Sequence, residues 1–298
     1  MELIEHITQK ANERYVNHKC NNCLYSNCTS SCEKCLEYCH YPERAIKEGF
    51  ENRDYNCLNM IDFYVCKYSY KNATEIIQAF LCMKKIIENN TINILSLGCG
   101  PCSDLMAIDT LKKRKLISFD KIYYRGIEFN PKIWSNIYSD IGNDFEEKHI
   151  INEDVVNISN FDMYLKNDAT NIICINYLLS TIQRCKPDSI NFFLNSLACS
   201  INNSKKKIIV LFNDINLSIN YEGGIREYFD TFASKLIGYS SKEIHFKGSK
   251  HNHYEYGNEY PNSTILYNDL VNEEKYKPYK VCGSAQKIIY KRTRRCKS

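Results

Sequence analysis

The residues that could do chemistry begin with a glycine-containing turn. In the segment Asn93–Asp104 an apolar run ends at Gly98 and Gly100, after which a helix can begin. Glycines here permit a tight turn whose backbone can approach a ligand closely, and the next helix supplies unpaired N–H groups at its N-terminus. Two glycines after a strand can also form an ordinary turn, but the arrangement fits a nucleotide-like ligand.

A carboxylate follows the next apolar run along the chain. Glu128 comes directly after the segment 121–127. If the two runs are adjacent parallel strands, this carboxylate lies beside the glycine turn, where it can accept both hydrogen bonds of a ribose diol. A dehydrogenase fingerprint needs a third glycine at position 103, where this chain has Ser103, so the dinucleotide interpretation is disfavoured.

Together these segments resemble the class I S-adenosylmethionine-dependent methyltransferases. The matching segments are LSLGCGP as the cofactor loop, GIEFNP as the ribose-binding strand end, NEDV at 152–155 near the adenine, and IICINYLLS facing the transferred methyl group. The resemblance covers about residues 74–292. It implies an α/β fold with a Rossmann-like seven-stranded sheet and helices on both faces. It also implies S-adenosyl-L-methionine as the cofactor and methyl transfer as the reaction.

The resemblance also assigns residues to the cofactor site. The candidates are Ser96, Gly98, Cys99, Gly100, Asp104, Glu128, Phe129, Asn130, Asp154 and Asn176. Many family members have an acid at the position of Ser96, where it helps to hold the amino group of the methionine moiety. Asp104 or backbone carbonyls are the expected substitutes here. Because that acid is missing, a non-catalytic protein that binds the same cofactor is an alternative to an enzyme.

Three polar residues are candidates for handling the methyl acceptor. Methyl transfer from a sulfonium is an in-line displacement that mainly needs alignment in a dry pocket. Asn176 and Tyr177 follow the fourth apolar run and Asp214 follows the fifth, so we expect all three on the ligand side of the sheet. The structural alternatives are that Asn176 caps a helix, Tyr177 packs in the core and Asp214 forms a turn. The acceptor is predicted as RNA or another macromolecule, with a small molecule as the alternative.

The sixteen cysteines need an explanation other than disulfide bonds. We expect a cytoplasmic protein, and reducing compartments keep thiols reduced. Half of them lie in the first 66 residues: Cys20, Cys23, Cys28, Cys32, Cys35, Cys39, Cys57 and Cys66. Eight thiolates match two four-thiolate zinc sites, with His40 as a substitute ligand, and an iron–sulfur cluster is the alternative. Residues 1–73 are therefore predicted as a Cys-rich metal module that recognises substrate or covers the cofactor pocket, and 74–298 as the cofactor-binding domain.

Charge and a polar insertion supply two weaker signals. Residues 280–298 carry seven Lys or Arg and no acid, whereas the whole chain has a formal net charge of +4. The body is therefore slightly acidic, and this basic tail is the candidate contact for nucleic acid. His251 and His253 in the segment 249–261 could ligate a metal, but a substrate lid is the preferred interpretation of that segment.

Regular elements must position these residues. Strands are predicted at 92–97, 121–127, 148–154, 171–176, 206–212, 242–248 and 285–292, and helices at Ser103–Lys112, Pro131–Ile141 and Asp188–Ile201, with a further helix capped by Thr74. The composition, 44% hydrophobic and 25% charged, excludes disordered and collagen-like classes. No apolar stretch approaches the roughly 20 residues of a membrane span, and the N-terminus lacks a signal-peptide pattern. We therefore expect a soluble, cytoplasmic protein with no membrane partner.

Overall fold

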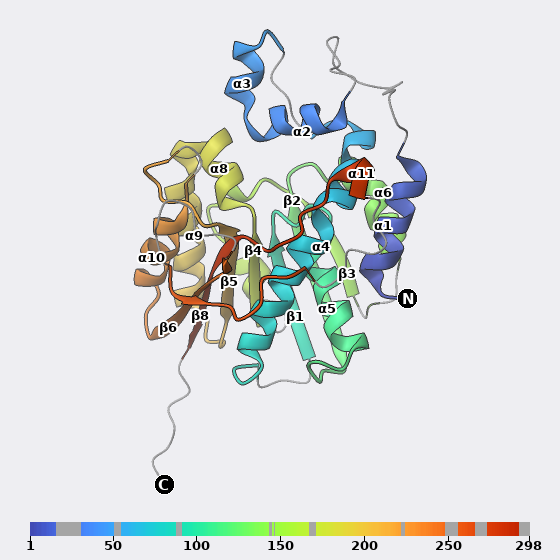
Figure 1. Cartoon of the computed structure of the whole chain (residues 1–298). Coiled ribbons are helices and arrows are strands. Elements are labelled where there is room, and N and C mark those ends of the chain that lie inside the picture. The colour runs from blue at the N-terminus through green and yellow to red at the C-terminus, as the bar shows by residue number, and fades with distance from the viewer. Residues whose placement is uncertain are drawn as a thin grey trace.

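The chain folds as an α/β protein in a computed structural model (Figure 1). The structure describes residues 1–15, 31–50, 55–87, 91–142, 145, 147–166, 171–221, 224–247, 256–265 and 273–291. The helices are α1 Leu3–Arg14, α2 Cys32–His40, α3 Pro42–Lys47, α4 Leu58–Met83, α5 Ser103–Lys113, α6 Ser135–Ile141, α7 Asp162–Lys166, α8 Leu179–Cys185, α9 Ile190–Asn203, α10 Arg226–Ser234 and α11 Glu273–Tyr276. The strands are β1 Thr91–Leu97, β2 Lys121–Glu128, β3 Glu147–Asn152, β4 Ile172–Asn176, β5 Ile209–Ile215, β6 Tyr239–His245, β7 Asn258–Glu259 and β8 Ser284–Lys291.

One mixed sheet holds these strands in the order β3-β2-β1-β4-β5-β8-β6-β7. Strands β1 to β5 are parallel, and β8 runs antiparallel to both β5 and β6. The strand order changes direction between β1 and β4, and ligands of open α/β sheets bind at the carboxyl ends of strands beside such a switch point. Leu97, Glu128 and Asn176, which end β1, β2 and β4, lie at that edge.

The predicted strand count of seven is wrong for this sheet, because eight strands are present among the described residues. The extra strand, β7, pairs with β6 in parallel, with Ile244 opposite Asn258. Gly257 precedes it with a φ of +63°, and a Cβ there would lie 2.2 Å from the carbonyl oxygen of Glu243. Only glycine permits so close a return of the chain. The His245 ring, hydrogen-bonded to the Tyr256 carbonyl, holds the same return.

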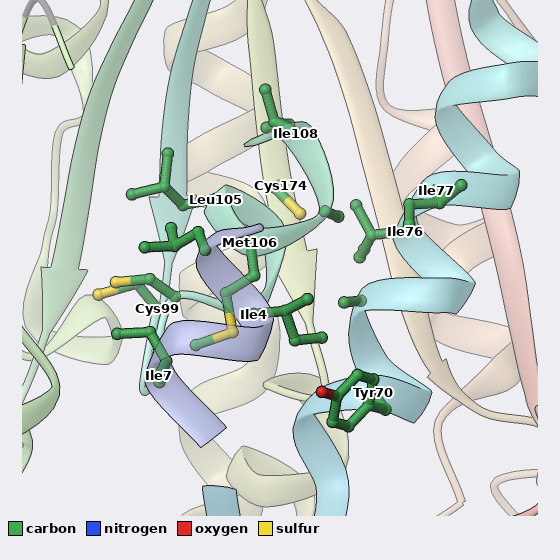
Figure 2. Packing of buried hydrophobic residues seen from close by; sticks show 14 of the residues in the cluster. Ile4, Ile7, Tyr70, Ile76, Ile77, Cys99, Leu105, Met106, Ile108 and Cys174 are labelled. Atoms are coloured by element: carbon green, nitrogen blue, oxygen red, sulfur yellow. The ribbon is translucent and has the colours of Figure 1, made fainter. Parts of the chain in front are cut away.

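Helices cover both faces of the sheet, as expected. One apolar cluster joins α1, α4 and α5 to the sheet through strand residues such as Ile94 and Tyr124. The other joins α9 and α10 to alternate positions, including Leu95 and Phe212. Figure 2 shows the first cluster, in which Ile4 of α1 and Ile76 of α4 approach α5. No helix within these ranges is both long and apolar enough to cross a bilayer.

Helix α4 differs most from the sequence expectation. It begins at Leu58 instead of at Thr74 and continues without interruption to Met83. Thr74 is buried in mid-helix, where its hydroxyl donates to the Tyr70 carbonyl at 2.7 Å instead of capping an N-terminus. The expected boundary between 1–73 and 74–298 therefore falls inside one continuous helix. The first half of α4 is rich in tyrosine and cysteine, so its helical period is not apparent from the sequence.

Candidate functional site

A cavity of about 270 Å³, called here the first cavity, opens at the carboxyl ends of β1, β2 and β4. Its floor is the turn Gly98–Gly100 together with Glu128 and Asn176. Tyr64 and Asn72 of α4 close it from the opposite side. The site thus combines the strand ends that the sequence predicted with a helix that it did not.

The glycine turn brings backbone to the surface of this cavity. Gly98 has a φ of +63°, and a Cβ there would lie 2.6 Å from Cδ1 of Leu178. Gly100 also has a positive φ, of +47°. The N–H of Gly98 donates to the carbonyl of Ile127 at 2.9 Å, which ties the turn to the end of β2. The turn is therefore rigid and has no side chain at either glycine to keep a ligand away.

Glu128 lies directly across from the turn. Its Oε2 accepts a hydrogen bond from the Gly100 N–H at 3.0 Å, and its Oε1 accepts from the Asn130 N–H at 3.3 Å. Burial raises the pKa of this carboxyl, and the backbone hydrogen bonds oppose that rise. Because each oxygen has further lone pairs, the carboxylate can hold its place and still accept donors from a bound molecule.

An open apolar rim continues from Glu128. Phe129 exposes 63% of its surface. Lys186 Nζ lies 5.6 Å from the Phe129 ring centre and donates to Asp154 Oδ2 at 2.5 Å. Asp154 also accepts from the Val156 N–H at 3.2 Å, which caps the short 3-10 helix Val155–Asn157 after β3. The flat Phe129 ring and the apolar Val156 side chain give this part of the cavity surfaces that suit a planar heterocycle.

Two of the predicted cofactor residues, Ser96 and Asp104, do not line this cavity. Asp104 lies behind the glycine turn, buried, where the Tyr124 hydroxyl donates to its Oδ1 at 2.8 Å and Ser96 provides another hydrogen bond. Burial raises its pKa. Because α5 begins at Ser103, Asp104 in its first turn points back toward β2 instead of toward the cavity. The expected role of Asp104 at an amino group has no support in this geometry.

The three candidate residues for the acceptor likewise differ in whether they line the cavity. Asn176 lines the first cavity, with its Oδ1 accepting from Asn213 Nδ2 at 2.7 Å. Asp214 lies within β5 instead of beyond it, is buried, and lines neither cavity described here. Its Oδ2 accepts from the Ser180 N–H at 3.1 Å, which caps the start of α8. Asp214 is therefore a structural residue, and its predicted catalytic role is not supported.

A second cavity, of about 520 Å³, shares a wall with the first. The shared residues are Tyr55, Tyr64, Asn72, Tyr177 and Thr181. Its aromatic lining is His40, Tyr41, Tyr55, Tyr64, Tyr68, Tyr177 and Tyr279. Of these residues, the sequence analysis assigned Tyr177 to the acceptor site and His40 to a metal site, and it missed the other five. The available signal was the spacing of Tyr64, Tyr68 and Asn72, which places them on one face of a helix once α4 is known to begin at Leu58.

Tyr177 forms the wall between the cavities and is conformationally strained. Its φ is +53°, which is uncommon for a residue other than glycine. Its N–H donates to the Asn213 carbonyl at 2.8 Å, and its hydroxyl donates to Glu75 Oε2 at 2.9 Å and contacts Lys71. Burial raises the pKa of the Tyr177 hydroxyl well above its usual value, so the residue is neutral. Strain held by such a network is typical of functional sites.

The cysteine prediction is not supported by the part of the chain that is described. No group of three or more potential ligands occurs there, and Cys20, Cys23 and Cys28 lie outside it, as do His251 and His253. Cys32, Cys35 and Cys39 lie buried on α2, where Asn59 donates to the Cys32 sulfur at 3.2 Å. Cys57 precedes α4 and is buried.

Cys66 in particular is a core residue. Its thiol donates to the Thr8 carbonyl of α1 at 3.7 Å, and burial raises its pKa to about 12. At about 1.5 Å of rise per residue, α4 separates Cys57 from Cys66 by roughly 13 Å, so the two cannot share one ion. His40 lines the second cavity, and burial lowers its pKa to about 4.

The basic tail contributes fewer available cations than its composition suggested. Lys287 is buried in β8, where it pairs with Asp230 and Glu243. It is therefore unavailable to a phosphate backbone. Residues 292–298 lie outside the described part of the chain.

Comparisons with known proteins find similarity at low identity. No family model and no curated protein sequence matches the chain. Among solved structures, the plantazolicin methyltransferase BpumL in complex with SAH aligns over 96% of this chain and 99% of its own, at 13% identity and a TM-score of 0.45. A proposed RNA methyltransferase from Pyrococcus horikoshii aligns over 73% of this chain and 80% of its own, at 12% identity and a TM-score of 0.37.

A third structure, a proposed class I S-adenosylmethionine-dependent methyltransferase from Listeria monocytogenes, aligns over all of this chain and 80% of its own. The identity is 12% and the TM-score 0.41. Because identities and TM-scores are this low, the function is argued from the site itself.

Proposed function

We propose that the chain is an S-adenosylmethionine-dependent methyltransferase that binds its cofactor in the first cavity. The observation that carries this proposal is the carboxylate of Glu128, at the carboxyl end of β2, held against the Gly100 N–H beside the β1–β4 switch point of the sheet. A carboxylate there can accept the two hydroxyl groups of a ribose. The turn beside it has no Cβ at Gly98 or Gly100, so an extended ligand can lie against the backbone.

The residues present fit this cofactor part by part. Glu128 would hold the ribose, and Phe129 with Val156 would pack on the adenine. The backbone of Gly98–Gly100 would contact the methionine moiety, and Asn176 would line the end where the sulfonium lies. When bound, the cofactor supplies an electrophilic methyl group, whose transfer depends mainly on alignment.

The shared wall of the two cavities provides that alignment in this proposal. Tyr55, Tyr64 and Tyr177 surround the junction, and aromatic side chains exclude water from it. The Lys71–Glu75 pair fixes the Tyr177 hydroxyl from behind, and so fixes the ring that borders both cavities. A nucleophile in the second cavity would thereby be held in line with the cofactor's methyl group.

Titration calorimetry with S-adenosylhomocysteine, and with NAD⁺ as a competitor of different chemistry, tests the proposal. We expect binding of S-adenosylhomocysteine and none of NAD⁺. The absence of S-adenosylhomocysteine binding would overturn the proposal. Binding of the cofactor without its consumption, in the presence of every acceptor tested, would favour the non-catalytic alternative.

A nucleic-acid partner at residues 280–298 remains a separate proposal, supported only by the charge of that segment. Because Lys287 is buried in ion pairs, the proposal rests on the remaining six basic residues. A gel-shift assay with RNA and DNA at low salt tests it, with a chain truncated after Lys291 as control. Equal binding by the truncated chain would refute a contact through the four basic residues after Lys291, and no binding by the full chain would refute the proposal as a whole.

A further inference from the structure

The second cavity has an unbalanced charge. Its ionisable lining, apart from tyrosines, consists of His40, Lys71 and Arg184, and no carboxylate belongs to the described lining. His40 is neutral near pH 7, since burial lowers its pKa to about 4. The character of the cavity therefore depends on the two cations.

Only one of these cations makes an ion pair among the described residues. Lys71 Nζ lies 3.2 Å from Glu75 Oε1, so that pair is neutral overall. Arg184, one residue before the end of α8, makes no ion pair with any carboxylate that the structure describes. Its guanidinium lies 5.7 Å from the ring centre of Tyr41. The charge of the buried Asp214 acts on Arg184, but Asp214 lines neither cavity. The cavity therefore presents a guanidinium without an ion pair, the group that proteins use to bind carboxylates and phosphates.

The wall that the second cavity shares with the first contains a buried acceptor without a donor among the described residues. Asn72 is 3% exposed, lines both cavities and is hydrogen-bonded to Tyr64, yet its Oδ1 has no hydrogen-bond donor among the residues that the structure describes. Burying an acceptor in this way is costly unless something donates to it. Asn72 lies on the shared wall, and the proposed methyl acceptor would present its nucleophilic atom at this wall.

Aromatic rings form much of the lining of the second cavity. Tyr64 and Tyr68 stack with centres 4.8 Å apart, and Tyr68 continues to Tyr279 at 5.4 Å. Such faces favour a planar occupant, because aromatic rings pack best in offset or edge-to-face contact. The volume of about 520 Å³ lies in the range of small-molecule sites.

We propose that the second cavity binds the methyl acceptor, and that this acceptor is a small aromatic acid. Its carboxylate pairs with Arg184, its ring lies against Tyr64 and Tyr68, and an N–H or O–H group at its far end donates to Asn72 Oδ1. The assignment of this ligand as the acceptor rests on the proposed function, whereas the binding of an aromatic acid does not. Arg184 and Asn72 act here as binding and positioning residues.

Matched probes test the inference by equilibrium titration. 4-Aminobenzoate carries both groups, 4-aminobenzamide lacks the charge, and benzoate lacks the N–H donor. We expect 4-aminobenzoate to bind at least tenfold more tightly than either of the other two. Arg184→Gln should abolish its advantage over the amide, and Asn72→Leu should abolish its advantage over benzoate.

Arg44→Gln is the matched control, because Arg44 also lies over Tyr41, at 5.1 Å, but pairs with Glu37 and does not line the cavity. It should leave all three affinities unchanged. S-adenosylhomocysteine titrated separately into each variant distinguishes the two proposals. If the probes respond to Arg184→Gln but S-adenosylhomocysteine does not bind, the proposed function fails and the aromatic-acid site stands. If S-adenosylhomocysteine binds but the acid shows no advantage over its amide, the inference is wrong.

Discussion

The first and second cavities share a wall but are built in opposite ways. The first is made at strand ends, where Gly98, Glu128 and Asn176 are fixed by the register of the sheet. The second is made largely by one face of α4 and by α8, with rings such as Tyr64 and Tyr68 and one guanidinium, from Arg184. The strand ends and the glycine turn of the first cavity suit a fixed ligand, whereas the side chains that line the second can differ in specificity without a change of fold.

Gly98→Val should have the largest effect and should act on the first cavity alone. A branched side chain at a φ of +63° is strained, and its Cβ would push Leu178 into the cavity. We expect S-adenosylhomocysteine affinity to fall more than about a hundredfold by calorimetry. Gly49→Val is the control, since Gly49 has a φ of +80° but nothing within 4 Å of its Cβ position. Unchanged affinity in Gly98→Val would contradict the site.

Glu128→Gln should weaken the same ligand less severely. It keeps the shape but removes the charge, and hydrogen bonds to charged groups contribute about 1.5–3 kcal/mol, or roughly ten- to a hundredfold in affinity. The measurement is again calorimetry with S-adenosylhomocysteine, beside melting temperature to verify folding. Glu147→Gln, at the exposed start of β3, should bind like the parent chain. If both variants bind equally, Glu128 does not contact the ligand.

His40 tests the second cavity through pH. Its pKa is about 4 in the folded chain and about 6.5 when unfolded, so the unfolded state binds the extra proton between these values. Stability should therefore fall as pH drops from about 6.5 toward 4. We expect the free energy of unfolding to fall by about 1–2 kcal/mol between pH 7 and pH 5 through His40. This is less than the full effect of the pKa difference, since the ring is only half-buried.

His40→Gln should lack this component of the pH dependence. Urea unfolding of both chains at pH 7 and pH 5 measures the difference. Asp62, whose pKa burial raises to about 6, contributes in the opposite direction but equally to both chains. Parallel pH profiles would show that His40 is not held neutral by the fold.

Cys66→Ser should have the smallest effect and concerns how the N-terminal wall is held. Cys66 is a core thiol hydrogen-bonded to Thr8, so Cys66→Ser should lower the free energy of unfolding by about 1 kcal/mol and leave the metal content unchanged.

Elemental analysis tests the predicted zinc site and its iron–sulfur alternative, with the exposed Cys199→Ser as control. Zinc or iron that is lost in Cys23→Ser but kept in Cys66→Ser would support a metal site outside the core. A metal-free parent chain would refute zinc and iron–sulfur alike.

Short-range pattern predicted much of the first cavity. The strands near 92–97, 121–127 and 171–176 are observed within one residue of their predicted ends. Gly98, Cys99, Gly100, Glu128, Phe129, Asn130, Asp154 and Asn176 all line the cavity. This succeeded because parallel strands align their carboxyl ends, so residues after each strand converge without any knowledge of packing.

Side-chain direction was beyond the reach of the sequence. Asp104 and Asp214 lie beside the site in the chain but turn into the core, to Tyr124 and to the start of α8. Both are short polar side chains next to an element boundary. Whether such a residue caps, packs or faces a ligand depends on partners distant in sequence.

The sequence by itself determined the parallel strands, the α/β class and a glycine turn facing a carboxylate, because apolar period and glycine conformation are local properties. Tertiary structure alone decided that α4 runs through the predicted domain boundary and lays Tyr64, Tyr68 and Asn72 over the strand ends. That placement depends on the packing of α4 against α1 and α5, which no local pattern encodes. The second cavity, and with it the chemistry of the proposed acceptor, exists only through that packing.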